Sequence, residues 1–212
     1  MMEFITIRHR AEAEYDEKKS RFLAFLQPVK STEHARAFLS EIKKAHPNAR
    51  HHVYAWILKD SVRCSDDGEP SGTAGTPVLA VLQKRSLTCV AAVVVRYFGG
   101  VLLGASGLVR AYGHAVSAAA DAAEFVTWHA CVRFVFLCGY DMLQSLQRLS
   151  KQMGYVQDIQ YTEKVLLKVA VPVETAQAFL KALADLSGGK IEPREGENCF
   201  EEAIHLPLMT GR

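Results

Sequence analysis

An apolar run that ends in two glycines and passes into a stretch of small residues constrains the fold of this chain more than any other feature. Residues 89–95 contain four valines and no charged side chain, which is typical of a central strand covered on both faces. Gly99 and Gly100 allow a sharp turn, and the small residues between Gly104 and Gly113 predict a helix packed closely on the strand. The sequence therefore predicts a strand, turn and helix unit in which main chain can closely approach other main chain or a ligand.

The same stretch has the spacing of a phosphate-binding loop without its lysine. Gly99 and Gly104 match the two glycines of G-x-x-x-x-G-K-[ST], but Ala105 stands where a lysine would contact the β- and γ-phosphates. This disfavours nucleotide hydrolysis. Two interpretations remain open: amide N–H groups at the helix start, flanked by Arg96 and Arg110, hold a single anionic group, or the glycines serve only close packing.

Composition indicates a folded protein of ordinary charge. The 212 residues are 49% hydrophobic, without an uninterrupted apolar segment long enough to cross a bilayer, and the first twenty residues are too charged for a signal peptide. Five cysteines, odd in number and never spaced C-x-x-C, argue against a disulfide framework and a thiolate zinc site. We expect a cytoplasmic protein with free thiols, no cofactor and no membrane association; the oligomeric state is not specified by the sequence.

The net charge of +2 is unevenly divided along the chain. Residues 1–128 hold 16 Lys and Arg against 13 Asp and Glu, whereas residues 129–212 hold 9 against 10. This excess permits a basic surface on the first half without requiring one.

Two domains follow from the order of the expected elements. Strands at residues 3–8, 20–29 and 50–58, a helix from Ser31 or Thr32 to Ala45, and a second helix capped by Thr76 precede the glycine turn. After Ala123 the pattern changes to β-α-β-β-α-β, which is the ferredoxin-like order, ending in a strand at residues 191–194. We therefore predict an α+β protein with domains at residues 1–127 and 128–196 and a tail at 197–212.

An acidic loop, SDDGEPSGTAG at residues 65–75, carries the candidates for chemistry. Asp66, Asp67 and Glu69, close in sequence to His51 and His52, suggest a divalent-metal-dependent hydrolase as one alternative. However, the loop lacks the spacing of a calcium loop, and the chain lacks the His and Cys patterns of zinc hydrolases and any nucleophile elbow. No catalytic residue or metal ligand is therefore assigned, and a non-enzymatic role is favoured.

A structural role for these carboxylates is the other alternative. One of the two aspartates would cap a turn, and Glu69 would pair with an arginine such as Arg50 or Arg96.

Five ordered motifs closely resemble the YigZ/IMPACT family. They are KKSRFLAFL at residues 18–26, HPNARHHVYAW at 46–56, SDDGEPSGTAGTP at 65–77, VVVRYFGGVLLG at 93–104 and GLVRAYG at 107–113. The chain departs from the family pattern at Ala105-Ser106, where Thr-Gly is frequent, and at Thr76, where a lysine is common. The second departure removes a positive charge and weakens the case for phosphate binding.

The resemblance implies a first domain similar to domain 2 of ribosomal protein S5, followed by a ferredoxin-like domain similar to one in elongation factor G. It also implies a translation-linked regulator. Eukaryotic members bind a ribosome-associated activator of an initiation-factor kinase, and bacterial members are suspected of binding nucleic acid. The family has no established catalytic residues to carry over.

The hypothesis favoured by these motifs is a non-enzymatic module that binds RNA or a ribosome-associated protein. A protein-interaction module without nucleic acid is a further alternative. The candidate nucleic-acid or anion-binding residues are Arg50, His51, His52, Arg96, Tyr97, Gly99, Gly100, Ser106 and Arg110.

Overall fold

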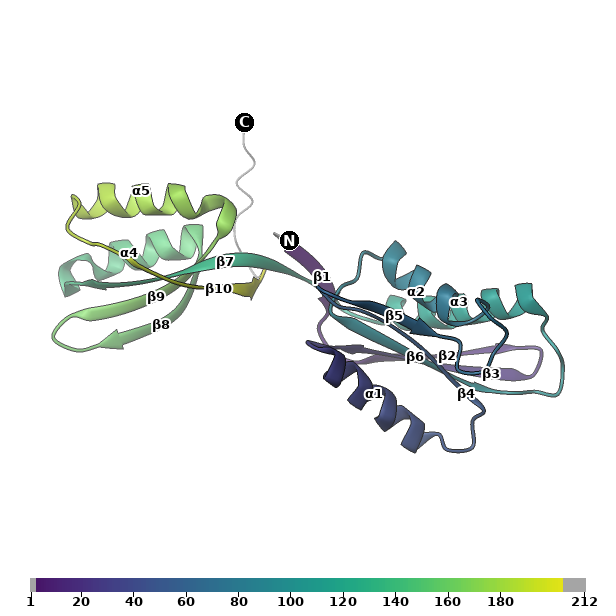
Figure 1. The fold of residues 1–212 in the computed structure, drawn as a ribbon. Coiled ribbons are helices and arrows are strands. Elements are labelled where there is room, and N and C mark those ends of the chain that lie inside the picture. The colour runs from purple at the N-terminus through teal and green to yellow at the C-terminus, as the bar shows by residue number, and fades with distance from the viewer. Residues whose placement is uncertain (1–2, 204–212) are drawn as a thin grey trace. The chain divides into compact units, whose positions relative to one another are not determined.

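The computed structural model describes residues 3–203, which divide into two compact units (Figure 1). Of the described residues, 4–126 form one unit, and residue 3 with residues 127–203 form the other.

The first unit is built on an antiparallel sheet with the strand order β2-β3-β6-β4-β5. Its strands are β2 (Ala11–Glu17), β3 (Ser20–Pro28), β4 (His51–Ile57), β5 (Val62–Ser65) and β6 (Val90–Tyr97). Helix α1 (Thr32–Ala45) covers one face, and α2 (Gly75–Lys84) and α3 (Ala105–Asp121) cover the other (Figure 1).

Strand β6 lies in the middle of this sheet and is buried on both faces, which confirms the predicted central strand. Val93 and Val95 belong to the cluster under α1, whereas Val90 and Val94 belong to the cluster under α2 and α3. The predicted start of α1 is also confirmed, because the Ser31 hydroxyl accepts a hydrogen bond from the amide of His34 at 3.2 Å.

The second unit has the predicted β-α-β-β-α-β order. Its elements are β7 (Phe125–Cys138), α4 (Tyr140–Met153), β8 (Tyr155–Tyr161), β9 (Val165–Pro172), a 3₁₀ turn (Val173–Thr175), α5 (Ala176–Ser187) and β10 (Arg194–Glu202). Within the unit, β7 pairs with β9 and β10, and β9 pairs with β8, whereas β1 (Glu3–Ile7) lies almost wholly in the first unit. The antiparallel path β10-β7-β9-β8 is the ferredoxin-like arrangement, so the expected α+β fold class is confirmed.

Several element boundaries differ from the sequence prediction. β2 was not predicted because its outward positions are acidic, although Ala11, Ala13 and Tyr15 alternate with them toward the core. β10 begins at Arg194 and continues to Glu202, so residues 197–202, expected in a tail, form a strand. The remainder of that tail, residues 204–212, lies outside the described residues.

No helix within residues 3–203 has the length and apolar character needed to cross a membrane.

The core of the second unit allows a direct stability test. Phe179 on α5 is fully buried, with its ring centroid 5.8 Å from that of Phe134. Phe179→Ala leaves a cavity and should lower the free energy of unfolding by about 3–5 kcal/mol in urea titrations. Leu186→Ala on the same helix is the control, because Leu186 is 42% exposed and should change stability by less than about 0.5 kcal/mol. Equal losses for both variants would contradict this core assignment.

Candidate functional site

A buried polar network joins the acidic loop to the glycine turn. Arg96 Nη1 donates to Glu69 Oε1 at 2.7 Å, and the hydroxyl of Tyr112 donates to the same oxygen at 2.7 Å. Arg96 Nη2 also lies 3.5 Å from the Ser20 hydroxyl, which accepts the amide of Gly99 at 3.3 Å. Thus β6, α3, the start of β3, the acidic loop and the glycine turn meet at one point.

The charges of this network are almost completely removed from water. The side chains of Arg96 and Glu69 are 7% and 4% exposed, and the guanidinium carbon lies 5.6 Å from the ring centroids of both Phe22 and Phe98. Burial raises the pKa of Tyr112, and the adjacent Glu69 carboxylate raises it further, so Tyr112 remains a neutral hydrogen-bond donor. A buried pair of this kind holds its elements in register because either charge alone is costly to bury.

Asp66 organises the second half of the acidic loop. Its Oδ1 accepts hydrogen bonds from the amides of Ala74 at 3.0 Å and Gly75 at 2.8 Å, and its Oδ2 accepts from Gly72 at 2.9 Å. Burial opposes ionisation of this carboxyl, but the three amide donors together lower the pKa of Asp66 below its usual range. Asp66 therefore satisfies the amides at the start of α2 from eight and nine residues upstream, in place of the predicted Thr76 cap.

Asp67 ties the loop to β4 and α1. Its Oδ2 accepts the amide of His52 at 2.7 Å, and its Oδ1 lies 3.2 Å from Lys43 Nζ. Nδ1 of His51 lies 2.9 Å from the Asp67 carbonyl oxygen, and Nε2 of His52 lies 3.0 Å from the carbonyl oxygen of His46. The rings of His51 and His52 therefore bind main-chain carbonyl groups and fix the positions of residues 67 and 46.

These contacts confirm the structural alternative for the acidic loop, in which an aspartate caps a turn and Glu69 pairs with Arg96. Within residues 3–203, no group of three His, Cys, Asp or Glu side chains is placed so that it could hold a metal ion.

A cationic turn lies directly against the glycine turn. Lys18 and Lys19 are exposed between β2 and β3, both with positive φ angles. A Cβ atom added to Gly99 would lie 2.0 Å from the Lys19 carbonyl carbon, so only glycine permits this approach. Figure 1 shows the β2–β3 hairpin turn and the β6–α3 loop at the same end of the first unit.

The start of α3 is open at this end. Gly104 precedes it with φ 74°, no side chain caps its first amides, and its first turn contains no acidic residue. Ala105 and Ser106 are exposed, as is Arg110 about one turn further along. We use the name cationic end for Lys18, Lys19, the 98–104 loop, Ser106 and Arg110.

The structure separates the predicted site residues into two groups. Gly99, Gly100, Ser106 and Arg110 lie at the cationic end, and Arg50 is exposed at residue 50, just before β4. The remaining four are structural in their contacts, since Arg96 is buried, Tyr97 is half-buried with its hydroxyl 2.9 Å from His46 Nδ1, and His51 and His52 bind the main chain. Arg96 therefore does not present its guanidinium to solvent, contrary to the expectation that it flanks an anion, because Glu69 neutralises it inside the unit.

Sequence reasoning did not identify the roles of Lys18, Lys19, Ser20 and Tyr112. The motifs KKSRFLAFL and GLVRAYG contain all four, but only the fold shows that they converge on Gly99 and Glu69.

Removal of Glu69 should destabilise the first unit strongly. Glu69→Ala leaves the buried guanidinium of Arg96 without its counter-charge, and we expect the free energy of unfolding to fall by about 3–5 kcal/mol. Glu12→Ala on the exposed face of β2 is the matched control and should change stability by less than about 0.5 kcal/mol in the same denaturant titration. A Glu69→Ala protein as stable as the control would show that the pair does not hold the unit together.

Asp66 should make stability depend on pH in the acidic range. Because its pKa is lower in the folded state than its ordinary value of 3.8, its contribution is present above about pH 4 and is lost as the pH falls through the folded pKa. Asp66→Asn should therefore be less stable at neutral pH and should lose less further stability on acidification. Thermal melting of both proteins from about pH 7 to about pH 3 measures this, and parallel curves would contradict it.

Comparison with known proteins assigns both units. The Impact N-terminal domain matches residues 18–120, and the domain of unknown function DUF1949 matches residues 136–190. A solved structure described as a hypothetical protein is 35% identical, with a TM-score of 0.63, and the match covers 93% of this chain and 98% of that one.

Curated relatives match over most of their length. An IMPACT family member of Haemophilus influenzae is 39% identical over 90% of this chain and 96% of the relative. IMPACT family member YvyE of Bacillus subtilis is 36% identical over 95% of both chains. IMPACT family member YigZ of Escherichia coli is 39% identical over 82% of this chain and 89% of the relative. At this identity and coverage, the chain belongs to the IMPACT family.

Proposed function

We propose that this protein is a non-enzymatic, translation-linked regulator that binds RNA, or RNA-bearing ribosomal components, through its cationic end. Membership of the IMPACT family suggests a translation-related regulatory role. A cytoplasmic location is part of the same proposal.

One observation carries the proposal: the exposed Lys18–Lys19 turn packs against Gly99 and so lies next to Gly100, whose main chain is exposed. An added Cβ at Gly100 would meet no atom within 4 Å, so a ligand can approach this backbone closely. A phosphate at this end would meet lysine charge and, near the open start of α3, free amide donors.

Apolar groups beside these cations suit a single strand better than a rigid duplex. Phe98 is 48% exposed and Leu102 is 84% exposed on the loop that follows β6. Unstacked bases bind aromatic side chains while lysines contact the intervening phosphates, and this combination is common in proteins that bind single strands. Arg96 supports the proposal indirectly, by holding the turn from inside.

Salt dependence of RNA binding tests the proposal. Binding of fluorescein-labelled oligouridine, followed by anisotropy, should weaken with salt at a log-log slope of about −0.7 for each phosphate contacted. Lys18→Gln combined with Lys19→Gln should weaken binding and make the slope shallower by about 1.4. The control is Lys151→Gln with Lys181→Gln, which removes the same charge from exposed positions on α4 and α5.

Co-sedimentation with ribosomes should fall for the Lys18, Lys19 variant and not for the control. Absence of RNA binding, a salt-independent affinity, or equal losses for both pairs of substitutions would each contradict the proposal.

A further inference from the structure

The outer face of α1 carries a hollow that the cationic end does not include. It has a volume of about 440 Å³ and is lined by Arg36, Leu39, Ser40, Lys43, Lys44 and Pro47. The lining positions on α1 recur every three or four residues, so they form one stripe along the helix, beside the buried stripe of Ala35, Phe38 and Ile42. The stripe is therefore mostly exposed and borders the core at Leu39.

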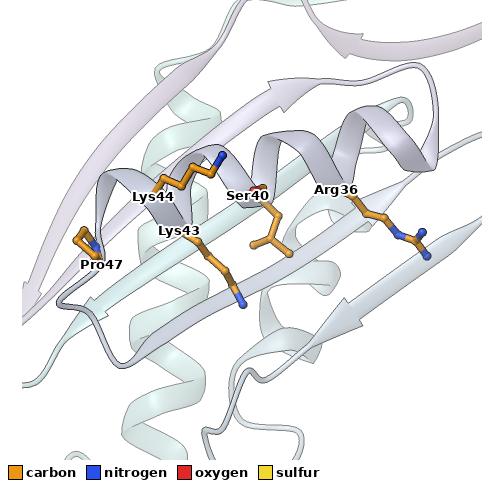
Figure 2. Close-up of a pocket in the computed structure, with 6 residues that line it drawn as sticks. Arg36, Ser40, Lys43, Lys44 and Pro47 are labelled. Carbon is orange, nitrogen blue, oxygen red and sulfur yellow. The ribbon is translucent and has the colours of Figure 1, made fainter.

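Three cations and no carboxylate line this hollow. Figure 2 shows the side chains of Arg36 and Lys43 extending in the same direction from α1, with Lys44 along its other side, so the cations frame the residues between them. Arg36 lies seven residues before Lys43, which separates their backbones by about 10 Å along the helix axis.

Neighbouring acidic groups cancel only part of this charge. Lys43 pairs with Asp67 at 3.2 Å, whereas within residues 3–203 Arg36 and Lys44 form no ion pair. Glu41 is engaged by Arg10 at 2.6 Å, away from the hollow's lining. Hydrogen bonds to its own backbone amide and to Ser31 lower the pKa of Glu33, and the charge of Arg36 lowers it slightly further. Glu33 does not line the hollow.

The floor between the cations is apolar. Leu39 is half-buried against the cluster under α1, and Pro47 closes the end of the stripe beyond the last turn. A nucleic-acid backbone would satisfy the cations but would place charged phosphate over Leu39. An acidic peptide with one apolar side chain satisfies both, because its carboxylates reach the rim and its apolar group covers the floor.

We propose that the α1 hollow is a docking site for an acidic protein segment that carries an apolar anchor residue. This surface is separate from the cationic end, and the inference does not depend on RNA binding there. The protein thus has a second binding surface, of different chemistry, on the same unit.

The test uses a fluorescein-labelled peptide of about twelve residues, alternating Glu and Asp around one central leucine, with anisotropy as the readout. The full-length protein should bind it, and the same peptide with serine in place of leucine should bind about tenfold more weakly. Arg36→Glu combined with Lys44→Glu should weaken binding of the leucine peptide about tenfold or more.

Two controls separate this site from general charge attraction. Lys151→Glu with Lys181→Glu reverses two cations on the other unit and should leave peptide affinity unchanged. The Arg36→Glu, Lys44→Glu variant should keep its affinity for oligouridine. The Lys18→Gln, Lys19→Gln variant should keep its affinity for the leucine peptide. Circular dichroism melts of each variant establish that the fold is intact.

Several outcomes would overturn the inference. They are no binding of the leucine peptide, equal binding of the serine peptide, and equal losses from the two charge-reversed pairs. Loss of oligouridine binding in the Arg36, Lys44 variant with no effect on the peptide would identify the hollow as an RNA contact instead.

Discussion

The first unit depends on a single carboxylate oxygen that accepts two donors from different elements. Glu69 Oε1 receives Arg96 from the central strand and Tyr112 from α3, while Arg96 approaches the Ser20 hydroxyl that also receives the glycine turn. Buried charge is tolerated only with such partners, so the acidic loop cannot take another path without exposing an uncompensated guanidinium. The acidic loop, which the sequence suggested as a possible metal site, therefore fixes the positions of the elements that form the cationic end.

Periodicity in the sequence was sufficient for much of the fold. The valine run identified the central strand, the Ser31 cap located α1, and the β-α-β-β-α-β order specified the second unit, because each signal is local or repeats at a fixed spacing. β2 was missed since its acidic outward residues mask the alternation, and β10 was misplaced because its pairing with β7 is set by partners more than fifty residues away.

The candidate site was harder to predict because burial decides the role of a charge. Arg96 and Arg110 look equivalent in the sequence, yet one is enclosed by Glu69 and the other is exposed. Lys18 and Lys19 were not among the predicted site residues, and only the fold places their turn against Gly99. Motif matching selected the candidate segments, and only tertiary structure assigned each residue to the interior or to the surface.

The network also bears on how this unit is made. Its partners lie 27 to 79 residues apart in the chain, and β3 pairs with β6, which is synthesised long afterwards. Contacts so distant in sequence form slowly, since a long loop must close before any of them is gained. During synthesis, the hairpin bearing the two lysines must therefore wait for α3 to emerge before its turn acquires a fixed shape. Any ligand binding that needs this shape is delayed until the whole unit has left the exit tunnel.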